Sequence, residues 1–233
     1  MTDHEEKTIT STCTICGVEF QATLHRFGGR TLPVTGLCAD CYEKQCQQEE
    51  LERERQRQDE ILEERIPSLY RQNNRSRMDP RLLKIVDGFD LKSGEGLFIS
   101  GDFGKQKTRA CALVLERYCR AGYSIRMIQS TVLAKHVVEQ FSDDEQTREK
   151  AKKNLLSCHW VDALLIDDLG KERATERFET ELFSLVEFRT STLRPTLYTS
   201  NLKLADLLQK FSPDNGGGIV RRITEFSLVV RAI

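Results

Sequence analysis

A glycine-containing stretch in the middle of the chain, SGDFGKQKTRA (residues 100–110), has residue types suited to binding phosphate. Gly101 and Gly104 allow the backbone to curl so that its N–H groups point inward, while Lys107 and Thr108 offer a cation and a hydroxyl. Such a loop must follow a strand and open a helix, because a helix N-terminus favours anions. The apolar run GLFIS precedes it and a helical pattern begins at Thr108. The stretch therefore predicts a loop that binds the phosphates of a nucleotide, with Mg²⁺ at Thr108.

One residue departs from this motif. Four of the five key positions of a GxxGxGKT frame are filled as expected, but Gln106 stands where glycine is usual. If φ is positive there, a Gln costs on the order of 1 kcal/mol or more, and its side chain must leave the path of the phosphates. We expect weakened ATP affinity and slow turnover, with binding retained better than hydrolysis. The residues expected to contact the nucleotide are Gly101, Asp102, Phe103, Gly104, Lys105, Gln106, Lys107 and Thr108. The alternative interpretation is an ordinary glycine turn before a helix.

Two carboxylates end an apolar run, ALLIDDLG, 60 residues after Lys107. In phosphoryl-transfer sites one such acid helps to hold Mg²⁺ and a neighbour orients the attacking water. Asp167 is the candidate for the first role and Asp168 for the second. Acidic pairs at strand ends are also common as solvated turn residues, but the spacing after the loop favours a nucleotide site.

Two further polar groups could complete this site. TLYTSN ends in Asn201, which would lie beside the two carboxylates, near the γ-phosphate. Arg221 and Arg222 follow a glycine run, residues 216–218, that we expect to be flexible. An arginine can stabilise transition-state charge in a neighbouring subunit. An ordinary pair of surface arginines is the alternative.

Four cysteines near the N-terminus form two pairs, CTIC and CADC, separated by 21 residues. Tetrahedral Zn²⁺ takes four such thiolates, and Gly17 suits the sharp turn after the first pair. So short a segment buries too small a core to fold alone, so the metal would stabilise it. Redox dithiols are the alternative, although no βαβ pattern surrounds either pair. His25 is a possible competing ligand. The predicted zinc ligands are Cys13, Cys16, Cys38 and Cys41.

The elements that must position these groups follow from composition. Residues 1–41 predict a zinc-ribbon domain, and residues 42–65 a charged connecting helix, with an oligomer contact as its alternative role. From residue 66 to 233, short apolar runs alternate with helical patterns, which predicts an α/β domain with a parallel sheet covered on both faces. The expected strands are 96–100, 124–128, 163–167, 195–200 and 226–230, and two expected helices are 108–121 and 177–190.

Bulk properties limit the classes of function. The 233 residues carry a formal net charge of −1 and are 39% hydrophobic, so a nucleic-acid surface must be a local patch. Residues 71–84 are the densest basic stretch and could contact phosphates, or they could be a solvated linker. We find no apolar run of 18 residues and no signal peptide, so we expect a cytoplasmic protein without a membrane span.

Taken in order, GxxGxxKT, LLIDDLG, RPTLYTSN and RRI resemble the AAA+ ATPases of the DnaC-type replicative helicase loaders, and transposition helpers of the IstB type share the pattern. The resemblance covers about residues 66–233 and includes IPSLYR (66–71). It implies a five-stranded parallel sheet of order 5-1-4-3-2, Asn201 as sensor 1 and Arg222 as an arginine finger acting in trans. It also implies a homo-oligomer that binds single-stranded DNA or a replicative DNA helicase.

These features predict an ATP-binding replication accessory protein, with ATP hydrolysis to ADP and phosphate, that loads a replicative helicase. The alternatives are a transposition helper of the IstB type and a scaffold that binds ATP without hydrolysing it, which Gln106 favours. The ribbon replaces the helicase-binding module of the best-known loaders, so the partner does not carry over from the resemblance.

Overall fold

A computed structural model describes residues 5–27, 30–31, 36–71 and 75–232 of the chain. The chain divides into two compact units, Met1–Arg57 and Gln58–Ile233. Within the described residues, no helix combines the length and apolar character needed to cross a membrane. The expected domain boundaries at residues 41 and 65 stay a prediction.

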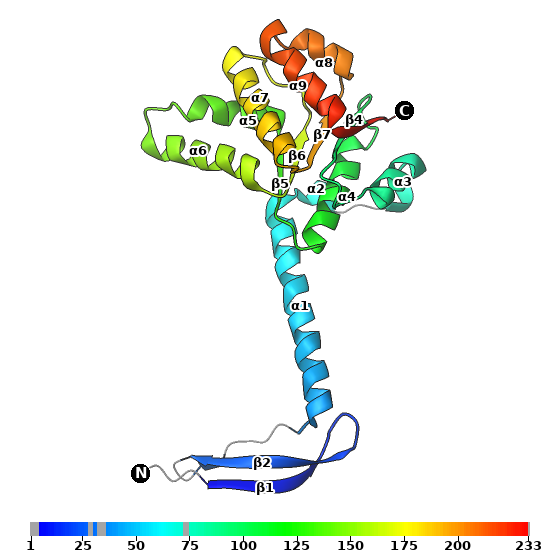
Figure 1. The fold of residues 1–233 in the computed structure, drawn as a ribbon, viewed down its shortest axis with the longest axis vertical. Coiled ribbons are helices and arrows are strands. Elements are labelled where there is room, and N and C mark those ends of the chain that lie inside the picture. The colour runs from blue at the N-terminus through cyan, green and yellow to red at the C-terminus, as the bar shows by residue number, and fades with distance from the viewer. Residues whose placement is uncertain (1–4, 28–29, 32–35, 72–74, 233) are drawn as a thin grey trace. The chain divides into compact units, whose positions relative to one another are not determined.

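The first unit contains a small antiparallel sheet. Strand β1 (Glu5–Thr12) pairs with β2 (Glu19–Phe27), and β2 pairs with the short β3 (Arg30–Thr31) (Figure 1). Helix α1 (Ala39–Arg65) begins in this unit and ends in the second one. Charged and amide side chains dominate α1, and its buried residue is Leu62, in the second unit.

The second unit is built on five parallel strands in the order β5-β6-β7-β4-β8 (Figure 1). Numbered along the chain within this sheet, the order reads 5-1-4-3-2 from the other edge, as predicted. Each strand lies within one residue of its expected position. The strands are β4 (Gly96–Ser100), β5 (Ile125–Gln129), β6 (Ala163–Asp167), β7 (Thr196–Ser200) and β8 (Ser227–Arg231).

Helices cover both faces of this sheet, because successive strand side chains point to opposite sides. Leu97 and Ile99 pack with α3 and α4 and the end of α1, whereas Phe98 packs with α5, α7 and α9. The prediction of a sheet buried on both faces holds for the inner strands β4, β6 and β7, which are buried throughout, whereas Leu228 and Val229 of the edge strand β8 are exposed. The helical segments are α2 (Ser68–Arg71), η1 (Arg75–Arg77), α3 (Pro80–Gly88), α4 (Lys107–Arg120), α5 (Ser130–Glu139), α6 (Glu145–Trp160), α7 (Glu176–Ser191), α8 (Leu204–Lys210) and α9 (Pro213–Glu225).

The glycine run at 216–218 corrects one expectation, because it lies inside α9 and is not a flexible link. Ser212 caps this helix and Pro213 occupies its first turn, which favours a helical start. A Cβ atom on Gly218 would lie 2.5 Å from Cε2 of Phe183 on α7. The glycine therefore allows α7 and α9 to approach closely.

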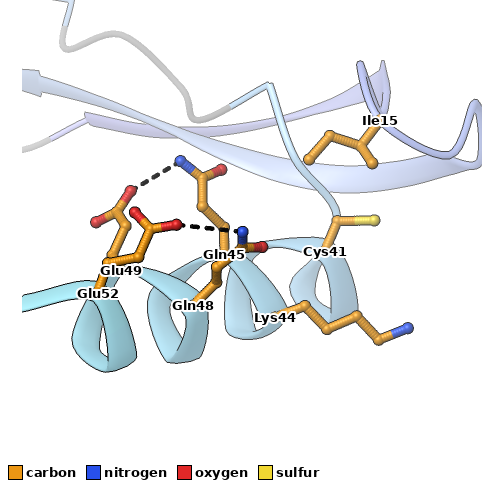
Figure 2. A pocket seen from close by; sticks show the side chains of 7 residues that line it. All are labelled: Ile15, Cys41, Lys44, Gln45, Gln48, Glu49 and Glu52. Carbon is orange, nitrogen blue, oxygen red and sulfur yellow. Dashed lines mark hydrogen bonds between the residues drawn. The ribbon is translucent and has the colours of Figure 1, made fainter. Parts of the chain in front are cut away.

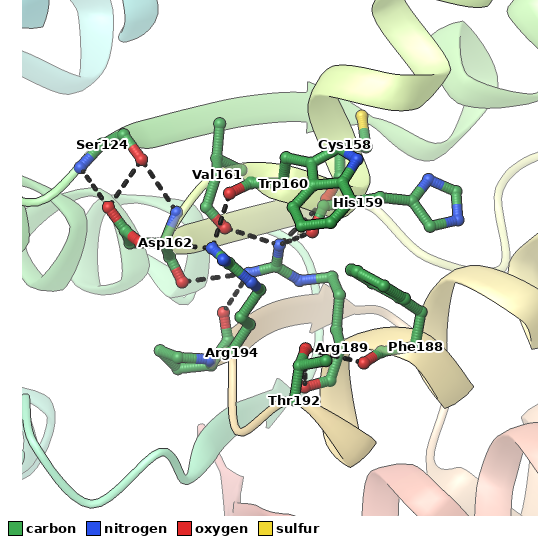
Figure 3. A network of polar contacts seen from close by, with 11 residues as sticks. Ser124, Cys158, His159, Trp160, Val161, Asp162, Phe188, Arg189, Thr192 and Arg194 are labelled. Carbon is green, nitrogen blue, oxygen red and sulfur yellow. Dashed lines mark hydrogen bonds and ion pairs between the residues drawn. The ribbon is translucent and has the colours of Figure 1, made fainter.

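The amino-terminal edge of the sheet is held by one buried cation, Arg189 of α7 (Figure 3). Its guanidinium donates to the hydroxyl of Thr196 at 2.8 Å and to the carbonyl of Pro195 at 2.7 Å. The other acceptors are the carbonyls of Cys158, His159, Val161 and Asp162. These bonds fasten the end of α6 and the starts of β6 and β7 to α7.

Candidate nucleotide and metal sites

The carboxyl ends of β4, β6 and β7 meet at one edge of the sheet, and the predicted nucleotide residues gather there. The loop after β4 leads into α4, whose N-terminus faces the same edge. Gly101 accommodates a close approach, since a Cβ there would lie 2.4 Å from the carbonyl oxygen of Ala232. The pocket at this edge is lined by Tyr70, Phe103, Gly104, Lys105, Gln106, Lys107, Thr108, Arg109, Asp168 and Asn201.

Lys107 is buried at the base of the loop, with three oxygen acceptors. Its Nζ donates to the carbonyls of Gly101 and Asp102, both at 2.8 Å, and to Oδ1 of Asn201 at 2.9 Å. Burial lowers the pKa of Lys107, and the carboxylates of Asp168 and Asp167 partly oppose that effect. The cation is thus fixed between the loop and the end of β7, and it joins Asn201 to the loop.

Thr108 and Asp167 lie close enough together to contribute to one magnesium site. The hydroxyl of Thr108 donates to Oδ1 of Asp167 at 2.7 Å, and Thr199 donates to the same oxygen at 2.6 Å. Two neighbouring ligands of an octahedral Mg²⁺ at about 2.1 Å lie about 3.0 Å apart. Thr108 and Asp167 therefore fit as adjacent contributors to one Mg²⁺ shell. Burial raises the pKa of Asp167, against the hydrogen bonds from Thr199 and Thr108.

Asp168 sits in an unusual backbone conformation at the end of β6. Its φ is 56°, in the left-handed region that is costly for residues other than glycine. The N–H of Asp168 donates to Oγ1 of Thr199 at 2.9 Å, and its carboxylate pairs with Lys171 at 3.2 Å. Such strained residues cluster at functional sites. Asp168 lines the pocket, whereas Asp167 is buried, and the separate roles of the two acids stay predictions.

Gln106 has the positive φ that makes a glutamine strained at this position. Its φ is 58° and its ψ 19°, so a non-glycine residue occupies the left-handed region directly before α4. Its side chain reaches outside the loop, where Oε1 accepts from the N–H of Asp79 at 3.2 Å. The effect on affinity and turnover stays a prediction.

Arg222 lies on α9, apart from the residues that line the pocket. It forms an ion pair with Glu187 of α7, and its guanidinium carbon lies 5.1 Å from the ring centre of Phe183. Arg221 is more exposed and pairs with Glu225 at 3.3 Å. A residue that acts on a neighbouring subunit is not expected in its own chain's pocket, so the trans role of Arg222 stays a prediction.

Two pocket residues were missed from the sequence. Arg109 directly follows Thr108 in the first turn of α4, and this adjacency could have revealed it. Tyr70 comes from α2, well before the loop, within the IPSLYR segment. Burial raises the pKa of Tyr70, and the charges of Asp167 and Asp168 add to the effect. No local pattern around Tyr70 indicates that it faces a nucleotide pocket.

The four cysteines of the first unit come together as one cluster. Their sulfur atoms all lie within 4.8 Å of one another, and the sulfurs of Cys16 and Cys38 are 3.7 Å apart. Tetrahedral zinc with bonds of about 2.3 Å places its sulfurs about 3.8 Å apart. Gly17 has a φ of 73°, and its N–H donates to the carbonyl of Cys13 at 2.9 Å, which closes the first turn. The donor set fits Zn²⁺.

Hydrogen bonds around the sulfurs act differently on two of the cysteines. Backbone N–H groups of Cys16 and Cys38 lower the pKa of Cys13 to about 6, as expected of a turn whose amides face a thiolate. Hydrogen bonding with the Cys16 side chain raises the pKa of Cys41 to about 12. The His25 side chain lies outside the described residues. Figure 2 shows Cys41 and Ile15 at one end of a groove along the first turns of α1, whose other lining residues are Lys44, Gln45, Gln48, Glu49 and Glu52.

The basic stretch at 71–84 is partly neutralised by acidic neighbours. Arg71 pairs with Glu63 at 3.3 Å, and Arg75 pairs with Asp87. Residues 72–74 and the side chain of Arg77 lie outside the described residues. Contact with nucleic acid through this stretch therefore stays a prediction, as does its alternative, a solvated linker.

This geometry defines a P-loop nucleotide-binding protein with an AAA+ core, since the loop, the two-acid strand and the polar end of β7 meet at one edge of a 5-1-4-3-2 sheet. The chain belongs to the family of IstB-like ATP binding proteins, whose model matches residues 40–231. The predicted resemblance is confirmed.

Comparisons with individual proteins agree with this family assignment. The chain is 28% identical over 125 residues to the replicative helicase loader DnaI of Bacillus subtilis strain 168, which covers 53% of this chain and 39% of the relative. The chain thus matches about two fifths of that curated protein. The match to the crystal structure of DnaI covers 72% of this chain and 92% of the DnaI chain at 19% sequence identity, with a TM-score of 0.58. The match to that of the DnaC helicase loader covers 66% and 86% at 23% identity, with a TM-score of 0.51. These two likenesses show the fold.

Proposed function

We propose that this protein is an ATPase that assists DNA replication by loading a replicative helicase. The observation that carries the proposal is the convergence of Lys107, Thr108, Asp168 and Asn201 with the buried Asp167 at one sheet edge. The similarity to the loader DnaI supports the choice of process. The family itself is compatible with other uses of ATP.

The residues of this chain divide the chemistry among them. On binding, Lys107 would exchange at least one of its three present oxygen acceptors for a phosphate oxygen, and the N-terminus of α4 would hold the phosphates with it. Asn201, which accepts from Lys107, lies beside the position expected for the γ-phosphate. Thr108 and Asp167 would hold Mg²⁺, which neutralises charge that develops on the phosphate oxygens. Asp168 orients and polarises the attacking water. Its carboxylate lines the pocket, and its backbone is fixed by Thr199.

Turnover of ATP in the presence of single-stranded DNA tests the enzymatic part. We expect DNA to stimulate phosphate release by the full chain and Lys107→Ala to abolish it. Binding of ATP without any turnover above that of Lys107→Ala would favour the non-hydrolysing scaffold instead. Gln106 is the feature that favours this scaffold, since glycine is usual at its position.

The identity of the binding partner would distinguish a helicase loader from a transposition helper of the IstB type. The family assignment favours the helper as second candidate. Binding of the purified chain to a purified replicative helicase, compared with a purified transposase from the same source, distinguishes the two. The loader hypothesis expects ATP-dependent retention of the helicase, and retention of the transposase alone would replace it.

A homo-oligomer with Arg222 acting in trans is part of the proposal. Arg222 lies outside its own pocket and is held by Glu187 and Phe183 on α7. Mixing Lys107→Ala with Arg222→Ala tests this role, because some mixed interfaces pair an intact loop with an intact arginine. We expect each variant to be inactive alone and activity to return on mixing. No recovery would contradict the trans assignment.

We propose that the cysteine cluster binds Zn²⁺ and folds the first unit around it. The fit of sulfur spacing to a zinc tetrahedron supports this proposal. Metal analysis of the purified chain should give one zinc per chain, and Cys38→Ser should lose it. Cys46→Ser is the matched control, because Cys46 lies on exposed α1 outside the cluster. Equal zinc content in the two variants would contradict the assignment.

A further inference from the structure

Gln106, the residue that replaces glycine in the loop, connects the loop to a distant part of the chain. Its Oε1 accepts a hydrogen bond from the backbone N–H of Asp79 at 3.2 Å, 27 residues earlier. Asp79 is the N-cap of α3, and its own carboxylate accepts from the N–H of Arg81 at 2.8 Å. The start of α3 is therefore bonded in two directions, to its own first turn and to the nucleotide loop.

The backbone at Gln106 directs the side chain toward this contact. Its left-handed conformation ends the loop, and its carbonyl accepts the first bond of α4, from the N–H of Ala110 at 3.0 Å. The side chain makes no capping bond to α4, although the residue holds the N-cap position. The strain of a left-handed glutamine belongs to the folded loop, so it lowers folding stability. It lowers ATP affinity only if binding changes that backbone.

The start of α3 also packs with a residue of the pocket. Tyr70 of α2 lines the pocket together with the loop residues. Tyr70 packs against the core cluster that contains Met78, Leu82 and the buried side of α4. A hydrogen bond from the loop to Asp79, the residue after Met78, therefore ties the loop to the packing that supports Tyr70.

We propose that Gln106 is a positioning residue, whose side-chain amide fixes the phosphate-binding loop against the start of α3 and so keeps the pocket in shape for ATP. The proposal rests on the proposed function of this site, the binding of ATP. If Gln106 only damaged the loop, Gln106→Gly would bind ATP more tightly than the natural chain, and our proposal expects the opposite. Glycine at this position removes strain but cannot reach Asp79, so Gln106→Gly binds ATP more weakly than the natural chain.

Two substitutions separate strain from the hydrogen bond. Gln106→Ala removes the bond and keeps the strain, whereas Gln106→Gly removes both. We expect both to weaken ATP binding by about threefold to tenfold, the usual worth of one hydrogen bond, and the glycine variant to have the higher melting temperature. An unchanged or tighter affinity in Gln106→Gly would overturn the proposal and restore the interpretation of a damaged loop.

A matched pair at Asp79 identifies the bond itself. Asp79→Pro removes the donor N–H at a residue whose φ of −57° suits proline, whereas Asp79→Ala removes only the capping carboxylate. Gln106→Ala should have no further effect on ATP affinity in the Asp79→Pro chain and its full effect in the Asp79→Ala chain. Equal effects in both backgrounds would contradict the proposal.

Hydrogen exchange distinguishes failure of this inference from failure of the proposed function. The Asp79 amide should exchange several-fold faster in Gln106→Ala than in the natural chain, whether or not ATP is present. Faster exchange in a chain that does not bind ATP would disprove the proposed function and, with it, the role in ATP binding. Unchanged exchange would remove the bond on which the inference rests.

Discussion

Two buried cations lie at opposite edges of the same sheet, and they serve different purposes. Lys107, at the carboxyl edge, is 6% exposed and donates to three oxygens, one of them on the side chain of Asn201. Arg189, at the amino edge, is fully buried, and its bonds go to five backbone carbonyls and one hydroxyl. Lys107 faces a pocket, whereas Arg189 is enclosed by the backbone that it joins.

Burial acts on both groups in the same direction. It lowers the pKa of Lys107 and lowers that of Arg189 to about 10. The acceptors of Arg189 are neutral, so many carbonyl dipoles replace a counter-ion. Lys107 instead has Asp167 and Asp168 nearby, and their charges favour its protonated form. The comparison teaches that burial of a cation does not identify a binding site. What identifies one is a pocket beside it with further polar side chains.

The largest effect is expected from removal of the structural cation. Arg189→Met should lower the free energy of unfolding by more than about 3 kcal/mol, because several buried carbonyls lose a partner at once. The fluorescence of Trp160, the one tryptophan of the chain, reports on this edge during urea unfolding. A loss below about 1 kcal/mol would show that the carbonyl network contributes little.

The next effect concerns the other cation. Lys107→Met should weaken ATP binding by about 10- to 100-fold, as loss of a charged hydrogen-bond donor predicts, and change unfolding by no more than about 1 kcal/mol. Lys92→Met is the control, since Lys92 is an exposed lysine before β4. If Lys107→Met unfolds the protein as Arg189→Met does, the contrast between the two cations is wrong.

Removal of the buried charge beside Lys107 sharpens the contrast. Asp167→Asn keeps an oxygen for the bonds from Thr108 and Thr199 but removes the carboxylate that would hold Mg²⁺. We expect the Mg²⁺-dependent gain in ATP affinity to fall about tenfold, the cost of a lost charged interaction. Titrations with and without Mg²⁺ measure it. An unchanged dependence on Mg²⁺ would exclude Asp167 from the metal site.

The natural chain and Asp167→Asn are expected to differ in how their stability depends on pH. The pKa of Asp167 is raised in the folded protein, so the folded state holds this proton to higher pH than the unfolded state does. Stability of the natural chain relative to Asp167→Asn should therefore fall as pH rises from the ordinary range of Asp through the raised pKa, and then level off. Urea unfolding of both chains across that range checks the sign. A rise would mean that the hydrogen bonds outweigh burial.

The smallest effect belongs to Arg194, a partly buried arginine near Arg189. Arg194 bonds the carbonyl of Trp160 at 2.6 Å and lies 5.6 Å from the centre of its ring. Arg194→Ala should cost about 0.5–1 kcal/mol and shift the Trp160 fluorescence. A cost comparable to that of Arg189→Met would mean that exposure does not separate the two arginines.

The sequence anticipates the strands and the acidic pair because their signals are local. Five apolar runs predict five strands, of which the three inner ones are fully buried, and the turns at Cys13–Cys16 and Cys38–Cys41 predict a cluster that the structure contains. The features that the sequence does not reveal depend on contacts between segments far apart along the chain. Nothing near Arg189 in the sequence shows that six oxygens surround it, since they come from the end of α6, the two residues before β6, and the start of β7 with the residue before it. The glycine run that includes Gly218 is typical of a flexible link. The contact with Phe183 that requires a glycine there comes from another helix, so the sequence does not reveal it. Tyr70 was missed for the same reason.

The central claim is that this edge of the sheet binds ATP through Lys107. Calorimetric titration of ATP–Mg²⁺ into the full chain and into Lys107→Met tests it directly. We expect one site per chain, with affinity weakened about 10- to 100-fold by the substitution, and Trp160 fluorescence should show that both chains are folded. Binding of equal strength in the two chains, or no binding to the natural chain, would contradict it.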